Sequence, residues 1–410
     1  MQSSTKLEQA DGALSRPLVI LLGFAVGALA ANLYYAQPIV AIIGRSLGLD
    51  PAAAGLVMTL TQIGYCAGMV LAVPLGDLVE NKRLMLVMMT IVVLGLCGLA
   101  FVHHAVPYFL AAFATGLGAS TVQIIVPYAA SFVPEARRGR TVGQIMSGLM
   151  LGIMLSRPIS SVITDALGWH AVFVGSAVLM AALAIALWRI LPPRRPAQTG
   201  LSLAAVFRSM ARLVVDHPVL RRRALYQACM FGAFCLFWTA VPLLLAGPRF
   251  GLSQTAIAIF ALVGVAGAIA SPIAGRAADR GQTRVASLLA LAGGAGAFVV
   301  GHVAPHAGAT AIVLLGAMAI VLDAGVSTSL VLGQRAIFSL DANLRGRLNA
   351  VFIVITFIGG AFGSAVGAWA FARGGWGLTT WIGLGLPSLA LAVFATEARV
   401  PGATLVAGYR

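Results

Sequence analysis

The sequence predicts an all-α membrane protein whose twelve transmembrane helices form two pseudo-symmetric bundles of six. Three observations support this fold class. The 410 residues are 60% hydrophobic and only 10% charged, whereas the composition of a soluble domain includes about 25% charged residues. Apolar runs of about 20 residues, the length that crosses a hydrocarbon core of about 30 Å, recur along the chain. Two short motifs also recur at one fixed offset in the two halves.

Twelve predicted spans follow from the apolar runs. They lie near 17–43, 52–75, 84–102, 107–131, 141–164, 170–190, 224–246, 253–274, 283–303, 308–331, 347–370 and 377–395. The first is long enough to tilt or to kink at Pro38. The spans predict an N-terminal bundle at 1–190, a cytoplasmic linker with a short amphipathic helix at 191–223, and a C-terminal bundle at 224–410.

The net charge of +15 raises the question of nucleic-acid binding, and the distribution of the basic residues answers it. If both termini are cytoplasmic, 23 basic residues lie on the cytoplasmic side and only Arg45, Arg249 and Arg373 lie opposite. This split follows the positive-inside rule. We therefore expect an integral protein of a bacterial inner membrane, with the lipid bilayer and not nucleic acid as its partner.

Two motifs indicate a duplicated six-helix unit. "RGR" at 138–140 recurs at 345–347, and "GW" at 168–169 recurs at 375–376, both with an offset of 207. The predicted helix between the two motifs has the same length in each half. Agreement in both offset and position favours an internal repeat.

A third similarity between the two halves lies in two short loops, "VPLGDLVENKR" at 73–83 and "GRAADRG" at 275–281. Both resemble the cytoplasmic signature G-x-L-a-D-r-x-G-r-r of the major facilitator superfamily. The second loop keeps Gly275, Asp279 and Arg280, and the first keeps Leu75, Asp77, Lys82 and Arg83 but has Val73, Leu78 and Glu80 at other signature positions. Across its length the chain resembles a transporter of this superfamily, in particular its twelve-span drug/proton antiporter group.

This resemblance implies two bundles that rock about a central site, with spans 2, 5, 8 and 11 between them. Small residues four apart let helices approach closely in lipid, and rows of them predict packing between the bundles. The rows are Gly64, Gly68, Ala72 and Gly76; Gly148, Gly152, Ser156 and Ser160; Gly267, Ser271 and Gly275; and Gly359, Gly363 and Gly367.

The resemblance also implies a cytoplasmic gate formed by the charged residues of the two signature loops. The predicted gate residues are Asp77, Lys82, Arg83, Asp279 and Arg280. An aspartate there can pair with arginines or accept backbone N–H groups and so latch one conformation. The alternative is a set of solvated loop charges that contribute little.

Two ionisable residues fall at membrane depth, Arg157 in "GIMLSRPIS" and Asp323 in "IVLDAGVS". Charges there are costly and mark functional sites by default. A carboxylate deprived of water can hold a proton, so Asp323 is the predicted proton-coupling residue; the alternative is a structural hydrogen bond.

Arg157 is the second predicted proton-coupling residue. It lies where antiporters of the superfamily carry G-x-x-x-G-P-x-x-G-G, which Gly148, Gly152 and Pro158 resemble in part, while "SRPIS" replaces the ending. Three interactions are open to the guanidinium: it can snorkel outward, donate to carbonyls near the proline, or face Asp323.

Polar and aromatic residues of spans 1, 4 and 7 are the predicted substrate-binding residues. These are Asn32, Tyr34, Tyr35, Gln37, Gln123 and Trp238. A site rich in aromatic rings with one carboxylate suits an amphiphilic or cationic solute better than a sugar.

These features predict a monomeric, proton-coupled secondary transporter that exports small amphiphilic or cationic compounds. The alternatives are a proton symporter or uniporter that imports a metabolite, and a transport-inactive membrane scaffold or sensor. We expect no enzyme activity and no cofactor, because the chain lacks a Walker lysine and an H-E-x-x-H pattern. We expect no metal site either, since the four cysteines fall inside apolar spans without paired ligand spacing.

Overall fold

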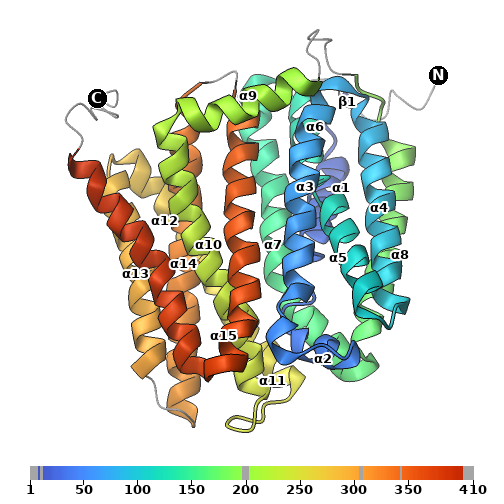
Figure 1. Cartoon of the computed structure of the whole chain (residues 1–410). Coiled ribbons are helices and arrows are strands. Elements are labelled where there is room, and N and C mark those ends of the chain that lie inside the picture. The colour runs from blue at the N-terminus through green and yellow to red at the C-terminus, as the bar shows by residue number, and fades with distance from the viewer. Residues whose placement is uncertain (1–7, 10–12, 196–202, 304–307, 342–343, 400–410) are drawn as a thin grey trace. The chain divides into compact units, whose positions relative to one another are not determined.

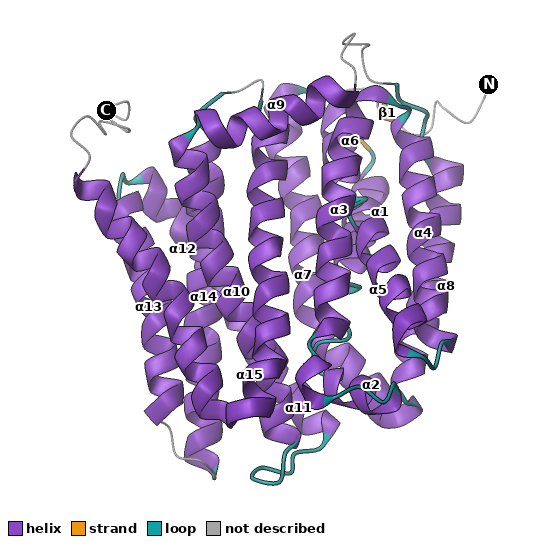
Figure 2. Cartoon of the chain, in the orientation of Figure 1, coloured by secondary structure: helices purple, strands orange, loops and turns teal. Residues whose placement is uncertain are grey.

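The computed structural model describes residues 8–9, 13–195, 203–303, 308–341 and 344–399, and nearly all of these residues are helical (Figures 1 and 2). Within this described part, the strands are limited to one short antiparallel pair, β1 (Glu8–Gln9) and β2 (Ala13–Leu14). The all-α prediction is confirmed.

The chain divides into two compact units. Unit 1 comprises Met1–Leu49 and Leu56–Ser209, and unit 2 comprises Asp50–Gly55 and Met210–Arg410. The linker helix α9 (Leu203–Asp216) runs across the division between them. It is amphipathic, with Val206, Met210 and Leu213 buried.

Unit 1 contains the helices that correspond to the first six predicted spans. They are α1 (Arg16–Ala31), α2 (Val40–Ser46), α3 (Leu56–Leu78), α4 (Asn81–Phe101), α5 (Ala105–Ala119), α6 (Val122–Ser131), α7 (Glu135–Leu167) and α8 (Trp169–Ile190). The first span differs from the prediction: it is interrupted over residues 32–39, where the chain forms turns, and Pro38 is only one residue of this break.

The fourth span is also interrupted, between α5 and α6. Two hydroxyl groups satisfy backbone carbonyls there. Ser120 donates to Leu117 O at 2.8 Å and Thr121 donates to Gly118 O at 2.6 Å. Such local bonds let a helix break inside a membrane protein without leaving carbonyl groups unpaired.

Unit 2 contains the short helix η1 (Pro51–Ala53), the counterparts of the last six predicted spans, and the terminal turn η3 (Thr396–Arg399). The counterparts are α10 (Pro218–Ala246), α11 (Gln254–Ala261), η2 (Leu262–Val265), α12 (Ala266–Asp279), α13 (Thr283–Val303), α14 (Ala309–Phe338) and α15 (Arg345–Ala395). The backbone of α15 departs from helical geometry at Gly375, with φ 61° and ψ −156°, so this element is two helices joined at a kink.

By length and composition, nine helices of the described chain are apolar and long enough to cross a membrane. One of them, α15, has 51 residues and a helical length near 75 Å, enough for two crossings. The first and eighth predicted spans consist of shorter helical pieces. Each predicted span therefore has a helical counterpart.

The two repeated motifs make the same contacts in each unit. Arg138 donates from Nε to Ala130 O at 3.1 Å, and Arg345 donates from Nε to Phe338 O at 3.0 Å. In both cases the first arginine of "RGR" bonds a carbonyl at the end of the preceding helix, where orphan carbonyls and the helix dipole favour a cation. The repeated sequence thus encodes a repeated helix connection.

The repeated "GW" motif marks a repeated turn. Gly168 has φ 84° and Gly375 has φ 61°, a left-handed conformation that glycine adopts without a Cβ clash. The tryptophans that follow, Trp169 and Trp376, are both buried. Each glycine ends one long helix and the buried indole anchors the start of the next.

The rows of small residues pack helices inside each unit, so the prediction that they join the two bundles is wrong for the glycines whose neighbours are described. A Cβ on Gly148 or Gly152 of α7 would lie 2.1 or 2.0 Å from a carbonyl oxygen of α1. In unit 2, a Cβ on Gly363 of α15 would lie 1.9 Å from Gly232 O of α10.

The same holds for α3, where Gly64 and Gly68 face α5: an added Cβ would lie 2.0 and 2.2 Å from its carbonyl oxygens. Small residues of this kind allow close backbone approach wherever helices cross in lipid. Spacing alone identifies a packing face but does not say which helix covers it.

Candidate functional site

Asp323 and Arg157 are the charged residues that the structure buries among the side chains it describes, with 5% and 3% of their surface exposed. They belong to different units, Asp323 to α14 and Arg157 to α7. A buried charge needs hydrogen-bonding partners to offset the loss of water. Each has a hydrogen-bonding partner within its own unit.

Asp323 accepts a hydrogen bond from an aromatic residue of α10. The indole Nε1–H of Trp238 donates to Asp323 Oδ1 at 2.9 Å, and both side chains are buried. Asp323 lies 14 residues from the first residue of α14 and 15 from its last, hence about 21 Å from either end. The predicted proton-coupling and substrate-binding residues Asp323 and Trp238 therefore meet in the middle of unit 2.

Aromatic rings surround the tryptophan that holds this carboxylate. The ring of Trp238 lies 5.3 Å from Phe237, 6.1 Å from Phe260 and 6.5 Å from Phe234, each in an edge-on arrangement. Such contacts fix the indole orientation. Asp323 thus accepts from an oriented donor that lies among aromatic rings.

Arg157 contacts two residues of the broken first span. Its Nε donates to Gln37 Oε1 at 2.8 Å, and its guanidinium carbon lies 5.6 Å from the centre of the Tyr34 ring. A cation above an aromatic face is attracted by the ring. Arg157 and two of the predicted substrate-binding residues, Tyr34 and Gln37, therefore form one cluster, which we call the Arg157 cluster.

The remaining predicted residues of the first span are buried in the same unit. Asn32 accepts a bond from Ser176 of α8 at 2.6 Å and donates to Ala28 O at 2.9 Å, and Tyr35 is 8% exposed. A regular helix would have turned neighbouring residues about 100° apart. The break removes that constraint, and the polar side chains of "NLYYAQ" are all buried.

Gln123 makes its hydrogen bond with a residue outside the Arg157 cluster. Its amide Nε2 donates to the Tyr65 hydroxyl of α3 at 3.1 Å. The sequence pattern predicted Gln123 but not Tyr65 or Ser176, because neither belongs to a recognisable motif and only the helix packing gives each its polar partner.

Three buried groups beside or near Arg157 make no hydrogen bond within the described chain. They are Gln37 Nε2, Ser161 Oγ and Thr164 Oγ1. A buried polar group left unpaired costs about 1–3 kcal/mol, so three of them are a substantial local cost. Ser160, by contrast, donates to Arg157 O at 3.0 Å.

Three of the predicted gate residues, Asp279, Lys82 and Arg83, make contacts within their own units. Asp279 pairs with Arg335 at 2.6 Å, linking the ends of α12 and α14, and the two side chains are 65% and 46% exposed. Arg280, next to Asp279, is exposed. The side chain of Asp77 lies outside the described residues.

In the first loop, Asn81 and Lys82 contact the segment that follows α8. Lys82 donates to Leu191 O at 2.7 Å, and Arg194 donates to Asn81 Oδ1 at 2.7 Å. Arg83 lies 3.5 Å from Glu80. The loop is therefore anchored to residues 191–194, a contact that the signature itself does not reveal.

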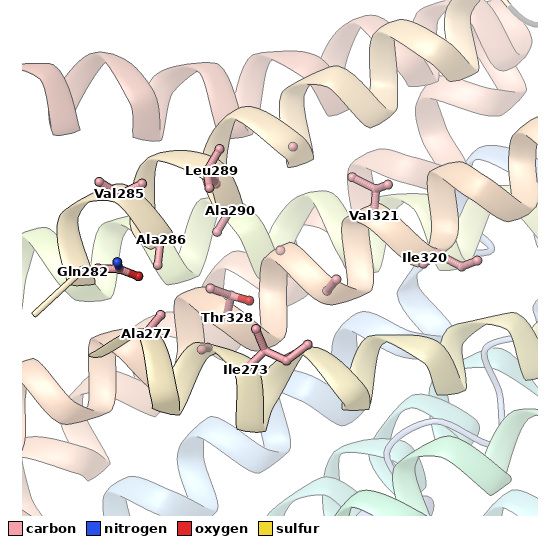
Figure 3. A pocket seen from close by; sticks show the side chains of 14 residues that line it. Ile273, Ala277, Gln282, Val285, Ala286, Leu289, Ala290, Ile320, Val321 and Thr328 are labelled. Carbon is pink, nitrogen blue, oxygen red and sulfur yellow. The ribbon is translucent and has the colours of Figure 1, made fainter. Parts of the chain in front are cut away.

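Unit 2 also contains an apolar groove of about 410 Å³ between α12, α13 and α14 (Figure 3). Its rim includes the exposed side chains Ile273, Val285 and Leu289. Residues on either side of Asp323 line it, but Asp323 itself does not. The groove is therefore distinct from the contact between Asp323 and Trp238.

The four cysteines lie inside helices, three of them buried. Among the residues that the structure places, no group of three or more histidine, cysteine, aspartate or glutamate side chains is arranged to hold a metal ion.

Comparison with known proteins gives one consistent result. A family model described as Major Facilitator Superfamily matches residues 20–341. The chain is 35% identical over 363 residues to the uncharacterized transporter YgaY of Escherichia coli O157:H7, covering 88% of this chain and 91% of that protein. It is 32% identical over 370 residues to the probable transporter SCO4007 of Streptomyces coelicolor, covering 90% and 84%.

Solved structures show the same fold. A crystal structure of the nucleoside transporter NupG matches with a TM-score of 0.77 and 15% identity, over 93% of this chain and 100% of that one. A bacterial homologue of the human lysosomal transporter Spinster matches with a TM-score of 0.72 and 14% identity, over 94% and 98%. At these identities the likeness concerns the fold alone, and it confirms the predicted fold class.

Proposed function

The chain belongs to the Major Facilitator Superfamily and is a membrane transporter, and on this premise we propose that it is a proton-coupled secondary transporter. In this proposal it exports small amphiphilic or cationic compounds from the cytoplasm of a bacterium through the inner membrane by alternating access. Asp323 carries the coupling proton. The proposed substrate-binding residues are Asn32, Tyr34, Tyr35, Gln37 and Gln123 in unit 1 and Trp238 in unit 2. The first alternative is proton-coupled or passive import of a metabolite, and the second is a transport-inactive scaffold.

One observation carries the proposal: Asp323 is a buried carboxyl group in the middle of a membrane helix, held by the N–H of Trp238. In this proposal Asp323 exchanges between the neutral acid and the carboxylate, and the indole N–H of Trp238 is a donor to the carboxylate. A group of this kind can take up a proton on one side of the membrane and release it on the other.

The packing of the site supports a coupling role over a purely structural one. Trp238 comes from α10 and Asp323 from α14, so their bond joins two helices of unit 2. Protonation of the carboxyl group weakens this bond because a hydrogen bond to a charged acceptor is the stronger one. A change in proton occupancy would therefore alter the contact between two helices.

The experiment is transport by purified protein in proteoliposomes under an imposed pH gradient. The cargo is the compound that most raises the protein's melting temperature in a screen of dyes, drugs and metabolites. Countertransport of this compound against protons supports export by antiport. Cotransport supports the symport alternative, and absence of flux with every stabilising compound supports the scaffold.

Asp323→Asn tests the proton site. The variant keeps the size and hydrogen-bonding capacity of the side chain but cannot release a proton, so gradient-driven flux should be lost while the melting temperature stays close to wild type. Asp165→Asn, at an exposed aspartate near the end of α7, is the matched control and should transport normally. Wild-type coupling in Asp323→Asn would refute the assignment.

A further inference from the structure

The geometry points to the Arg157 cluster as the binding site for a carboxylate group of the transported compound. This inference rests on the proposed function and narrows the substrate to an amphiphile that carries an acid. It places the site in unit 1, on the interrupted first span and one face of α7. Four observations carry it.

The first observation is the break itself. The first span stops being helical after Ala31 and resumes at Val40, and residues 33, 36 and 39 within the break are buried. Irregular backbone at membrane depth is tolerated where protein or a cavity surrounds it. In transporters, substrate sites are typically formed by such discontinuous helices.

The second observation is the orientation of Gln37, which has no exposed surface. Its amide oxygen accepts from Arg157 Nε at 2.8 Å. A guanidinium group only donates hydrogen bonds, so this contact fixes which end of the amide faces the arginine. The Nε2 group must point elsewhere, and it is a buried donor that has no partner in the described chain.

The third observation is a polar stripe on α7. Residues 157, 161 and 164 are spaced four and three apart, so they lie within about 60° on one face of a helix. All three are buried, although neighbouring residues such as Leu155 and Val162 are exposed. Ser161 Oγ and Thr164 Oγ1 make no hydrogen bond with described residues.

The fourth observation is the chemistry of the Arg157 cluster and of the polar stripe beside it. Arg157 brings a fixed positive charge, the Gln37 amide offers a donor, and the hydroxyls of Ser161 and Thr164 can donate as well. A carboxylate has two oxygens that accept about four bonds, and guanidinium binds it in a planar, two-pronged geometry. A cationic or purely apolar ligand would offer no acceptor to the Gln37, Ser161 and Thr164 donors.

The test is ligand-dependent melting of the purified full-length protein with three probes of equal chain length: hexanoate, hexanamide and hexylammonium. Hexanoate should raise the melting temperature in a saturable way and more than the other two. Gln37→Glu places a carboxylate against Arg157 from within the chain, so the apparent affinity for hexanoate should fall about tenfold or more. Gln144→Glu, at an exposed glutamine of α7, is the control and should leave the apparent affinity for hexanoate unchanged.

Three results would overturn the inference: no stabilisation by hexanoate, equal stabilisation by the amide or the amine, or an undiminished hexanoate effect in Gln37→Glu. The last two would mean that Arg157 and Gln37 serve only to brace α7 against the first span. Asp323→Asn separates this inference from the proposed function. It should keep the hexanoate effect while losing proton-driven flux, and hexanoate binding without any proton coupling would reject the proposed function alone.

Discussion

Trp238 on α10 donates its indole N–H to the carboxylate of Asp323 on α14, at 2.9 Å and with both side chains buried. This bond links the seventh and tenth spans within unit 2. Asp323 is the buried acid among the side chains that the structure describes, so loss of the Trp238 donor should be read out in proton-driven transport.

Trp238→Phe keeps an aromatic ring but removes the donor. A hydrogen bond to a charged group contributes about 1.5–3 kcal/mol, and its loss weakens the contact between α10 and α14. The rate of gradient-driven transport should therefore fall about tenfold or more. Trp369→Phe, at a tryptophan of α15 that is 45% exposed, is the control, and an unchanged rate in Trp238→Phe would contradict the role of the bond.

Gly152→Ala should destabilise unit 1. Its Cβ would lie 2.0 Å from Gly27 O and 2.4 Å from the same carbonyl carbon, so α1 and α7 must move apart. Overpacking of this kind costs about 1–3 kcal/mol, which thermal unfolding in detergent can measure. The control is Gly143→Ala on the same helix, where an added Cβ meets nothing within 4 Å. Equal stability of both variants would argue against the close contact of α1 and α7.

Gly375→Ala should lower stability through backbone strain alone. Gly375 has φ 61° and ψ −156°, and an added Cβ there meets no atom within 4 Å, so the cost comes from a positive-φ backbone that is almost exclusive to glycine, about 1–3 kcal/mol. Gly377→Ala, two residues later and also in open space, has an ordinary helical backbone and should be neutral or slightly stabilising. A comparison of the two melting temperatures checks this, and a harmless Gly375→Ala would mean that the turn can re-form without glycine.

Arg335→Gln and Asp279→Asn test whether the pair at the ends of α12 and α14 acts on transport or on stability. The two side chains are 46% and 65% exposed, and an exposed ion pair contributes at most about 1 kcal/mol. A double-mutant cycle on unfolding should therefore give a small coupling energy. If the pair is part of a gate, transport rates should change in the single variants, and unchanged rates would leave Asp279 as a surface charge.

The amino-acid sequence by itself determined the fold class and the two-fold repeat. Hydrocarbon thickness fixes how many apolar residues a span needs, so composition and run length were sufficient for the twelve spans. "RGR" and "GW" were also informative because each meets a local requirement, a cation at a helix end and a glycine at a positive φ. The identification of Arg157 and Asp323 followed from their cost in lipid, which depends on depth and not on neighbours.

The tertiary structure decided which residues these features meet. Spacing showed that Gly148, Gly152 and Gly363 pack closely but could not name the opposing helix, and the prediction of packing between bundles was wrong for that reason. The break at 32–39 was missed because its stability comes from buried contacts with α7 and α8, which lie more than a hundred residues away. The partners Trp238 and Gln37 were likewise set by packing, since hydrogen bonds between helices depend on positions that no local pattern encodes.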